Sequence, residues 1–329
     1  MDLSTTYLGL QLRSPLVASA SPLTLELDNI RTLEDGGAGA VVLPSIFEEQ
    51  IDLETEELDR RMEWGMDSSA EALSYFPAAA PYRTGSQRYL ETIRKARAAV
   101  EMPVIASLNG VTDSGWIEYA RDLEQAGASA IELNIYTVAT NPGVDAAAAE
   151  QRYVDILRLV RAAVNVPVAM KLSPYFSAPG AMIQRLESEG ADGFVLFNRF
   201  YQPDIDLDTL RLKRDLALSG RSEIRLPLLW IALMEGRGKA SLAASTGVET
   251  ADEVVKYLLV GADVVMTTSA LLRHGAGYMR TLHNGLTGWI ESRETTLAAM
   301  RGKMSLRRVK DPSAFERANY IRILQGWRP

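Results

Sequence analysis

Short apolar runs alternate with helical patterns along most of the 329-residue chain, and this alternation constrains the fold more than any other feature. The runs are rich in β-branched residues and nearly continuously apolar, which is typical of buried parallel strands joined by helices. We expect eight strands: Pro15–Ser21, Ala38–Ser45, Met102–Asn109, Ser129–Asn134, Val166–Leu172, Asp192–Asn198, Ala240–Ser245 and Ala262–Thr267. Eight such units predict an α/β fold of the (β/α)8 TIM barrel class.

Helical periodicity fills most gaps between these runs. The expected helices are Glu26–Asp35, Gln87–Val100, Trp116–Ala126, Ala147–Val164, Ala181–Glu189 and Ala251–Val260. Glycines at the ends of several helices, such as Gly127 and Gly261, can adopt the left-handed conformation that ends a helix. The apolar segment Leu226–Gly236 fits either a strand or a helix, and we expect a helix because a strand would be the ninth.

Two insertions interrupt the alternation, one after the second predicted strand and one after the sixth. The first runs from Ile46 to about Ser86 and begins with an acidic run at Glu48, which we expect to be a solvent-exposed helix face. The second runs from Arg199 to about Arg225. Insertions after strands lie at the C-terminal face of a barrel, where barrel enzymes carry their active sites.

Composition excludes several classes of function. The net charge of -7 argues against a nucleic-acid-binding surface. No apolar run reaches the roughly 20 residues that span a membrane, and the first residues lack the features of a signal peptide, so we expect a cytoplasmic protein. The absence of cysteine and the presence of only two histidines exclude thiolate nucleophiles, Cys-bound clusters and multi-His metal sites. We expect one domain over 1–329, with a helical C-terminal extension over 285–329.

Most residues at the C-terminal ends of the predicted strands are polar and neutral, and Lys171 is the one charged exception. A lysine within an apolar strand is costly to bury without a role. It could direct a cation at an anionic cofactor atom, serve as a Schiff-base amine, extend to the solvent at the barrel rim, or pair with a carboxylate.

Two further groups of strand-end residues suggest a ligand. Asn109, Asn134 and Asn198 each offer a donor and an acceptor, which suits a planar, amide-rich ligand such as a flavin ring or a pyrimidine. The pairs Thr246-Gly247 and Thr268-Ser269 follow the last two strands and precede helices. Their hydroxyls and nearby helix N-terminal amides predict a phosphate site, although ordinary N-caps would give the same pattern.

These residues together give the chain a resemblance to the dihydroorotate dehydrogenase family, the FMN-dependent barrels of class 1, from about residue 8 to residue 275. The segments that carry it are Glu132–Asn134, Met170–Phe176, Asn198, Thr246–Val265 and Thr268–Gly275. The resemblance implies oxidation of dihydroorotate, or of a related small CH–CH substrate, by proton abstraction and hydride transfer to FMN. It thereby implies a role in pyrimidine biosynthesis.

The resemblance also implies roles for the predicted site residues. Lys171 would stabilise negative charge on the reduced flavin. Asn109, Asn134 and Asn198 would contact flavin and substrate, and Ser19 and Ala20 would line the site of the flavin ring. The residues implied at the FMN phosphate are Thr246, Gly247, Thr268 and Ser269. Relatives of this class are often homodimers, and some use a partner electron-transfer subunit.

The loop after the fourth predicted strand departs from the family pattern, which places there a Cys or Ser that takes the substrate's proton. Thr137 falls on that position, and the neighbouring Tyr136 could serve as the base instead. The family's substrate-binding Asn aligns with Ala139, and Asn141 could replace it only if the loop shifts. Pro44 stands where the family has a lysine. The residues expected around FMN are therefore better retained than those expected around dihydroorotate.

Two other functions stay open at the level of sequence. One is a flavin-binding barrel that has lost catalysis or depends on a partner subunit. The other is a Schiff-base aldolase that uses Lys171 as its amine, which would leave the asparagine set unexplained.

Overall fold

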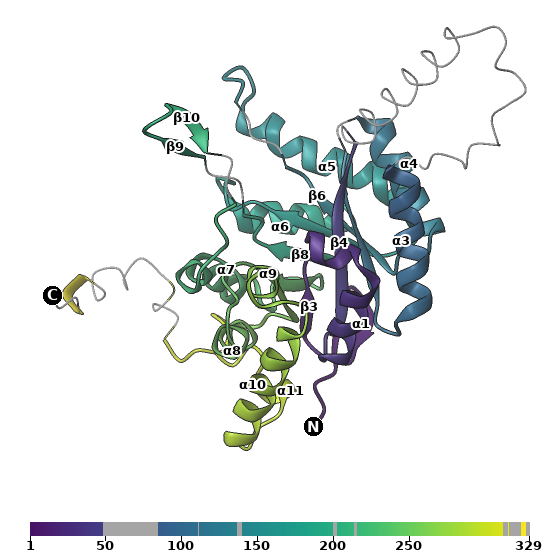
Figure 1. Cartoon of the computed structure of the whole chain (residues 1–329). Helices are drawn as coiled ribbons and strands as arrows, with labels where there is room; N and C mark the ends of the chain where they lie inside the picture. The colour runs from purple at the N-terminus through teal and green to yellow at the C-terminus, as the bar shows by residue number, and fades with distance from the viewer. Residues whose placement is uncertain are drawn as a thin grey trace, which may run out of the picture.

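The computed structural model describes residues 1–48, 85–110, 112–136, 140–199, 203–213 and 216–311, together with 315 and 324–326. Eight parallel strands close into a barrel, with helices around it (Figure 1). They are β3 (Leu16–Ala18), β4 (Ala40–Phe47), β5 (Val104–Asn109), β6 (Ala130–Asn134), β7 (Val168–Leu172), β8 (Gly193–Leu196), β11 (Ser241–Ala244) and β12 (Val264–Thr267). The predicted TIM barrel and its eight strands are confirmed.

The predicted helices also form. They are α1 (Leu27–Asp35), α3 (Gly85–Ala99), α4 (Asp113–Gln125), α5 (Ala146–Ala163), α6 (Pro179–Ser188), α7 (Arg225–Met234) and α8 (Ala251–Val260), followed by α9 (Ser269–His274), α10 (Tyr278–Ser292) and α11 (Leu297–Met300). Helix α7 occupies the ambiguous apolar segment, as predicted. Gly261 ends α8 in the left-handed region at φ 116°, as its place after the helix predicted. Helix α10 packs against α8 and continues through position 285.

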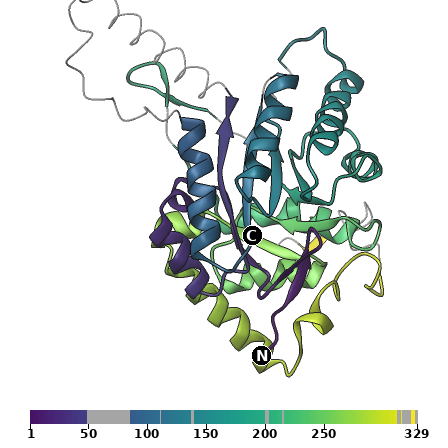
Figure 2. The same ribbon diagram turned by 90° about the vertical axis from the view of Figure 1, so that its right-hand side faces the viewer.

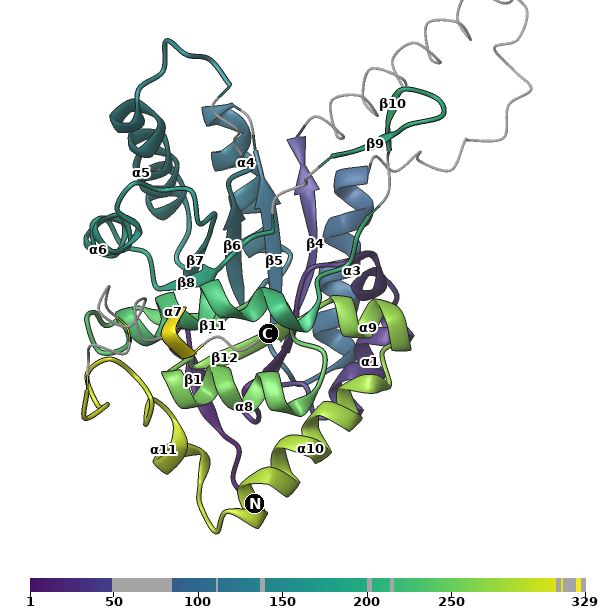
Figure 3. The same ribbon diagram turned by 90° about the vertical axis from the view of Figure 1, so that its left-hand side faces the viewer.

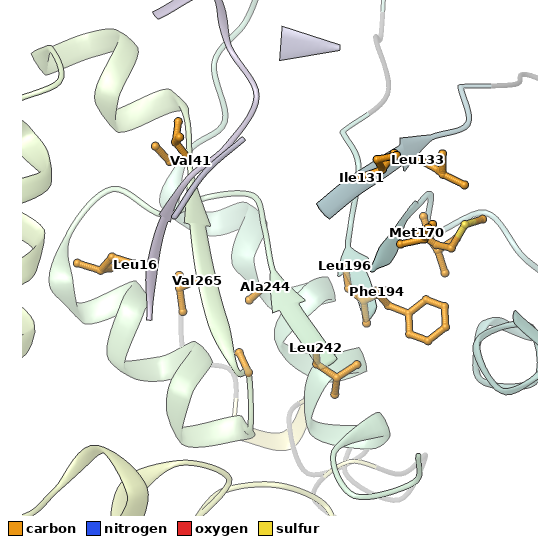
Figure 4. Close-up of a cluster of buried hydrophobic side chains, with 14 of the residues drawn as sticks. Leu16, Val41, Ile131, Leu133, Met170, Phe194, Leu196, Leu242, Ala244 and Val265 are labelled. Atoms are coloured by element: carbon orange, nitrogen blue, oxygen red, sulfur yellow. The ribbon is translucent and has the colours of Figure 1, made fainter. Parts of the chain in front are cut away.

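The strands present two different faces because side chains alternate along a strand. One set, including Ile131, Met170 and Phe194, packs with residues of the surrounding helices in the larger hydrophobic core, as Figure 4 shows for the strand side chains. The other set, including Ala130 and Ala169, lines a smaller core inside the barrel. The alternation therefore directs Glu132 and Lys171, two residues further along β6 and β7, into the barrel interior.

A hairpin that the sequence did not predict closes the N-terminal end of the barrel. Strands β1 (Thr5–Tyr7) and β2 (Leu10–Leu12) pair antiparallel, and Tyr7, Leu8 and Leu12 are buried with the inner strand residues. Leu8 packs so closely on β8 that a Cβ added to Gly193 would lie 2.5 Å from its Cδ2 atom. Figure 2 shows the purple N-terminal segment entering from the lower end of the molecule. In the described part of the chain, this hairpin thus covers the N-terminal end of the barrel.

The second predicted insertion forms a small hairpin and a short 3-10 helix in its described parts. Strands β9 (Asp204–Asp206) and β10 (Arg211–Lys213) pair antiparallel and project at the end opposite the N-terminus (Figure 3). The 3-10 helix η2 (Arg221–Ile224) leads directly into α7, and a similar turn, η1 (Pro22–Leu25), follows β3. Most of the first insertion, residues 49–84, lies outside the described residues.

The prediction that Glu48 lies on a solvent-exposed helix face is wrong. Glu48 is buried, and its Oε2 accepts a hydrogen bond from the backbone N–H of Thr112, 2.8 Å away. The Thr112 hydroxyl also donates to this carboxylate while it caps α4. The carboxylate is buried because it satisfies donors at the start of a helix that lies 64 residues further along the chain.

Candidate active site

A cavity of about 270 Å³ lies at the C-terminal ends of β3, β7, β8, β11 and β12. Four predicted ring-site residues line one part of it: Ser19, Ala20, Lys171 and Asn198. Four predicted phosphate residues line another part: Thr246, Gly247, Thr268 and Ser269. Ser21 also lines the cavity, and its hydroxyl is buried without a hydrogen-bond partner in the described part of the chain. A buried, unpartnered hydroxyl in a polar cavity is typical of a site that receives a ligand.

The other predicted residues do not line the described cavity. Asn109 is nearly buried at the end of β5. Tyr136 is partly exposed just after β6, and Thr137 lies outside the described residues. Asn141 is exposed, and its Oδ1 accepts a hydrogen bond of 2.9 Å from Gly143 N within an Asn-Pro-Gly turn. Asn134 does not line the cavity but contacts a residue that does, because its Oδ1 accepts a 2.7 Å hydrogen bond from Asn198 Nδ2.

A chain of polar side chains lies beneath Lys171 in the barrel interior. Lys171 Nζ lies 3.4 Å from Glu132 Oε1, and the two side chains are about 10% and 1% exposed. Ser107 Oγ also donates to Glu132 Oε1 over 3.5 Å and lies 2.7 Å from Ser45 Oγ. Ser45 in turn accepts a 3.1 Å hydrogen bond from Asn134 Nδ2. The alternative of a carboxylate partner for Lys171 is therefore observed, although the lysine also lines the cavity.

The charge on Glu132 affects two buried tyrosines. Burial raises the pKa of Tyr7 well above its usual value, and the negative charge on Glu132 adds to this effect. Burial also raises the pKa of Tyr89, again with a smaller contribution from Glu132. Tyr89 is held in place as its hydroxyl donates to the carbonyl of Pro44 over 2.7 Å. Both phenols are neutral at physiological pH, so neither adds a second negative charge near the carboxylate, and Lys171 is the cation that contacts it.

Ser219, which the sequence did not predict, joins three loops at the end of the cavity that the loops after β11 and β12 form. Its Oγ lies 2.9 Å from Ser269 Oγ and accepts a 3.2 Å hydrogen bond from Gly247 N. Its own backbone N–H donates to Ser269 Oγ over 3.1 Å. These contacts join the loops that follow β8, β11 and β12. Ser219 lies in the second insertion, where no local pattern distinguishes it from other loop serines.

Arg273 ties the same loops together from the outer side. Its Nη2 donates to the carbonyl of Ser219 over 2.9 Å, and its Nη1 pairs with Glu249. His274, the last residue of α9, has its Nε2 3.0 Å from Glu249 Oε1. His274 therefore behaves as a helix-end residue that stabilises a loop. Glu249 lies in the loop after β11, so this cluster supports the cavity wall.

The helix after β11 is capped internally. Thr250 is the N-cap of α8 and forms a capping box with Glu253. Thr250 is therefore an ordinary N-cap, and the polar groups at the cavity come from the loop before it. In that loop Thr246 has φ 83°, which is rare for a β-branched residue, and its hydroxyl donates to the carbonyl of Phe197 over 3.1 Å.

The part of the chain that the structure describes shows neither a candidate metal site nor a candidate membrane-spanning helix. Among these residues, no group of three or more His, Asp or Glu side chains could hold a metal ion. None of the described helices is both long enough and apolar enough to cross a membrane.

The cavity combines hydroxyls and a loop amide at one end with amides and a buried cation at the other. This arrangement suits a planar polar ligand that carries a phosphate.

Comparisons with known proteins agree with this arrangement. A family model described as dihydroorotate dehydrogenase matches residues 82–290. A protein of Aeropyrum pernix, provisionally named dihydroorotate dehydrogenase A (fumarate), is 26% identical over 296 residues, which are 88% of this chain and 94% of that protein. The catalytic subunit of dihydroorotate dehydrogenase B (NAD(+)) from Shouchella clausii is 29% identical over 175 residues, 52% of this chain and 58% of the subunit. The subunit of that name from Listeria monocytogenes is 30% identical over 170 residues, 50% of this chain and 56% of the subunit.

Proposed function

Because the chain belongs to the dihydroorotate dehydrogenase family, we propose that it is an FMN-dependent oxidoreductase that oxidises dihydroorotate, or a related small molecule, at a CH–CH bond. The observation that carries this proposal is the cavity that places Lys171 and Asn198 at one end and the loops after β11 and β12 at the other. Barrels commonly bind phosphate groups at the last two strand-end loops. The comparisons by themselves show that the chain is related to the oxidoreductases of this family.

The described residues fit FMN. The hydroxyls of Ser21 and Ser219, together with the loop residues 246–247 and 268–269, offer neutral donors for a phosphate and a ribityl chain. Gly247 allows the loop after β11 to pack against the start of η2, because a Cβ there would lie 2.8 Å from the carbonyl oxygen of Gly220. At the other end, Asn198 and Lys171 offer an amide and a cation to the polar edge of the ring. Asn134 would support that edge by fixing the amide of Asn198.

The bound flavin would supply the two-electron acceptor that no side chain of this chain offers. The residues of the chain would do the remaining work. We propose that Thr137, or Tyr136 beside it, takes the proton from the substrate carbon as a general base. Lys171 would stabilise negative charge at the floor of the site, and Asn134, Asn198 and Asn109 would orient ring and substrate. Asn141 would join them if its loop turns inward when substrate binds.

The family comparison leaves two points as proposals about assembly. The relatives from Shouchella and Listeria are named as catalytic subunits, and the matched part of this chain spans a little more than half of their length. We propose that this chain forms a homodimer and that, as a catalytic subunit, it passes its electrons to a partner subunit. The chain has no cysteine, so a Cys-bound cluster for this transfer would have to come from that partner.

One specific observation keeps a flavin-binding barrel without dihydroorotate activity as a second candidate. Pro44 and Ala139 stand where the resemblance expects substrate contacts. The aldolase alternative is weaker in this structure, because Lys171 is paired with the buried Glu132. A Schiff-base lysine needs an amine that is free to attack a carbonyl carbon, whereas the Lys171 amine contacts a carboxylate.

The substrate is tested by anaerobic addition of dihydroorotate to the FMN-loaded protein. The proposal predicts that the visible flavin bands bleach and that orotate forms in equal amount. Bands that persist with dihydroorotate, but bleach with a chemical reductant, would show that the natural substrate is another molecule. Trapping of a substrate on Lys171 by borohydride would replace the oxidoreductase proposal with the aldolase.

A further inference from the structure

The carboxylate of Glu132 is buried directly beneath Lys171, and only one of its oxygens is satisfied. Oε1 receives Lys171 Nζ at 3.4 Å and Ser107 Oγ at 3.5 Å, both of which are long contacts. Oε2 is fully buried and has no hydrogen-bond partner among the described residues. A buried ion pair is weak evidence for stability, so stability alone does not explain this pair.

Glu132 lies among buried side chains, so its charge affects groups that it does not contact. The β1–β2 hairpin closes the barrel below it with Tyr7, Leu8 and Leu12, and the Tyr7 hydroxyl is also buried without a partner in the described chain. Lys171 is 9% exposed and lines the cavity above. The pair therefore sits between a sealed apolar interior and the ligand cavity. Coulombic interactions are stronger there than at a solvated surface.

We propose that Glu132 is a positioning residue that holds the Lys171 ammonium at the cavity floor and, by opposing its charge, sets the reduction potential of the flavin bound above it. This role presupposes the FMN site proposed above. An ammonium beside the ring favours the reduced, anionic flavin, because it stabilises the added negative charge. A carboxylate on the far side of that ammonium reduces the net positive potential that reaches the ring.

The test compares the reduction potential of bound FMN in the wild type, Glu132→Gln, Lys171→Met and the double variant. Glu132→Gln should strengthen binding of reduced relative to oxidised FMN about tenfold, which raises the potential by about 30 mV for a two-electron couple. Lys171→Met should lower the potential. In the Lys171→Met background, Glu132→Gln should change the potential little, because a carboxylate that is buried without a counter-ion is neutralised by a proton, which leaves no charge for Glu132→Gln to remove. An unchanged or lowered potential in Glu132→Gln, or the full rise in the double variant, would overturn a role through Lys171.

A second readout uses the apoprotein and needs no flavin. The Lys171 amine should react several times faster with an acylating reagent in Glu132→Gln than in the wild type, as followed by mass spectrometry of its peptide. Lys256 is a matched exposed lysine and should react at the same rate in both proteins. Equal labelling of Lys171 would reject the positioning role. Failure to bind FMN would instead reject the proposed function, while the labelling result would still decide the role of Glu132.

Glu132→Asp covers the case in which Glu132→Gln does not fold. The aspartate keeps the charge but withdraws it from Lys171 by one methylene. Both readouts should then change in the same direction as for Glu132→Gln, and by less. A variant that folds like the wild type and changes neither readout would contradict the role.

Discussion

Asn198 donates a 2.7 Å hydrogen bond from Nδ2 to Oδ1 of Asn134, and this bond joins the ends of β8 and β6 across the intervening strand β7. Lys171 is on β7, so the two amides flank the strand that carries the buried cation. Asn134 is fixed from its other side, because its Nδ2 donates to Ser45 Oγ over 3.1 Å. The Asn198 amide lines the cavity, and it is oriented by Asn134, which does not line the cavity.

This relationship predicts coupling between the two asparagines in FMN binding. Asn198→Ala removes an amide from the cavity, and Asn134→Ala removes the acceptor that orients it, so each should weaken FMN binding about tenfold. The double variant should be little weaker than either single variant, because residues within one hydrogen-bond network are not additive. Fluorescence titration of the apoproteins with FMN measures all four affinities. Fully additive losses would mean that the bond between the asparagines has no part in binding.

At position 246 we predict that the usual order of stability, in which alanine is more stable than glycine, is reversed. Its φ of 83° is strained for any residue with a Cβ, so Thr246→Gly should be more stable than Thr246→Ala by about 1 kcal/mol. Both variants lose the hydrogen bond to Phe197, so that term cancels between them. Urea unfolding measures the difference. Ala148, exposed in α5, is the control, because Ala148→Gly should cost about 1 kcal/mol. Equal stability of the two Thr246 variants would show that the loop relaxes without strain.

Arg273 should affect the phosphate end of the site selectively. Arg273→Met removes the guanidinium that ties Ser219 to Glu249, so the loops around the phosphate lose support. We expect FMN affinity to fall about tenfold and riboflavin affinity, which lacks the phosphate, to fall much less. Isothermal titration with both ligands makes the comparison. Arg280→Met on α10 serves as a control, since this arginine contacts Asp35 and lies outside the cavity lining. Equal losses for both ligands would contradict a role at the phosphate end.

Glu253 predicts a change in acid stability. Burial acts to raise its pKa, but hydrogen bonds from Thr250 and the ion pair with Arg221 outweigh burial and lower the pKa. A carboxyl with a lowered pKa stabilises the fold above its unfolded pKa of about 4.3, and this contribution is lost as the pH falls through the folded value. Glu253→Gln should therefore lower the free energy of unfolding by about 1–2 kcal/mol at neutral pH and by less below about pH 4.

Urea unfolding at several pH values measures this dependence. The neighbouring Asp252 is exposed, and Asp252→Asn controls for a general loss of negative charge. Parallel curves for the wild type and Glu253→Gln across the acid range would show that Glu253 does not carry the linkage.

The identity of the general base is predicted from position alone. Thr137→Ala should slow flavin reduction by dihydroorotate about 10²- to 10⁴-fold, while FMN affinity stays unchanged. Tyr136→Phe keeps the ring and removes the hydroxyl, and it should have a much smaller effect. Anaerobic stopped-flow measurements separate the reduction step from binding. A large loss in Tyr136→Phe alone would assign the proton transfer to the tyrosine.

The sequence was sufficient to predict the barrel and much of the cavity lining, because both depend on local patterns. Apolar runs predict the strands, and Lys171 is conspicuous at the end of one of them. Its partner Glu132 is not conspicuous, because the contact between the two side chains depends on the register of β6 against β7. That register places Asn134 opposite Lys171, and Glu132 lies two residues before Asn134 on the same face of β6. Ser219 and Arg273 were not predicted for a similar reason, since they contact loops that are distant along the chain. Strands β1 and β2 have three residues each, too few for an alternation to identify.

The visible absorption spectrum of the purified protein shows whether this cavity binds FMN. We predict flavin bands in the protein as isolated, or after the apoprotein takes up one equivalent of added FMN, and weaker uptake in Asn198→Ala. A colourless protein that does not take up FMN at any concentration would contradict the proposed FMN site.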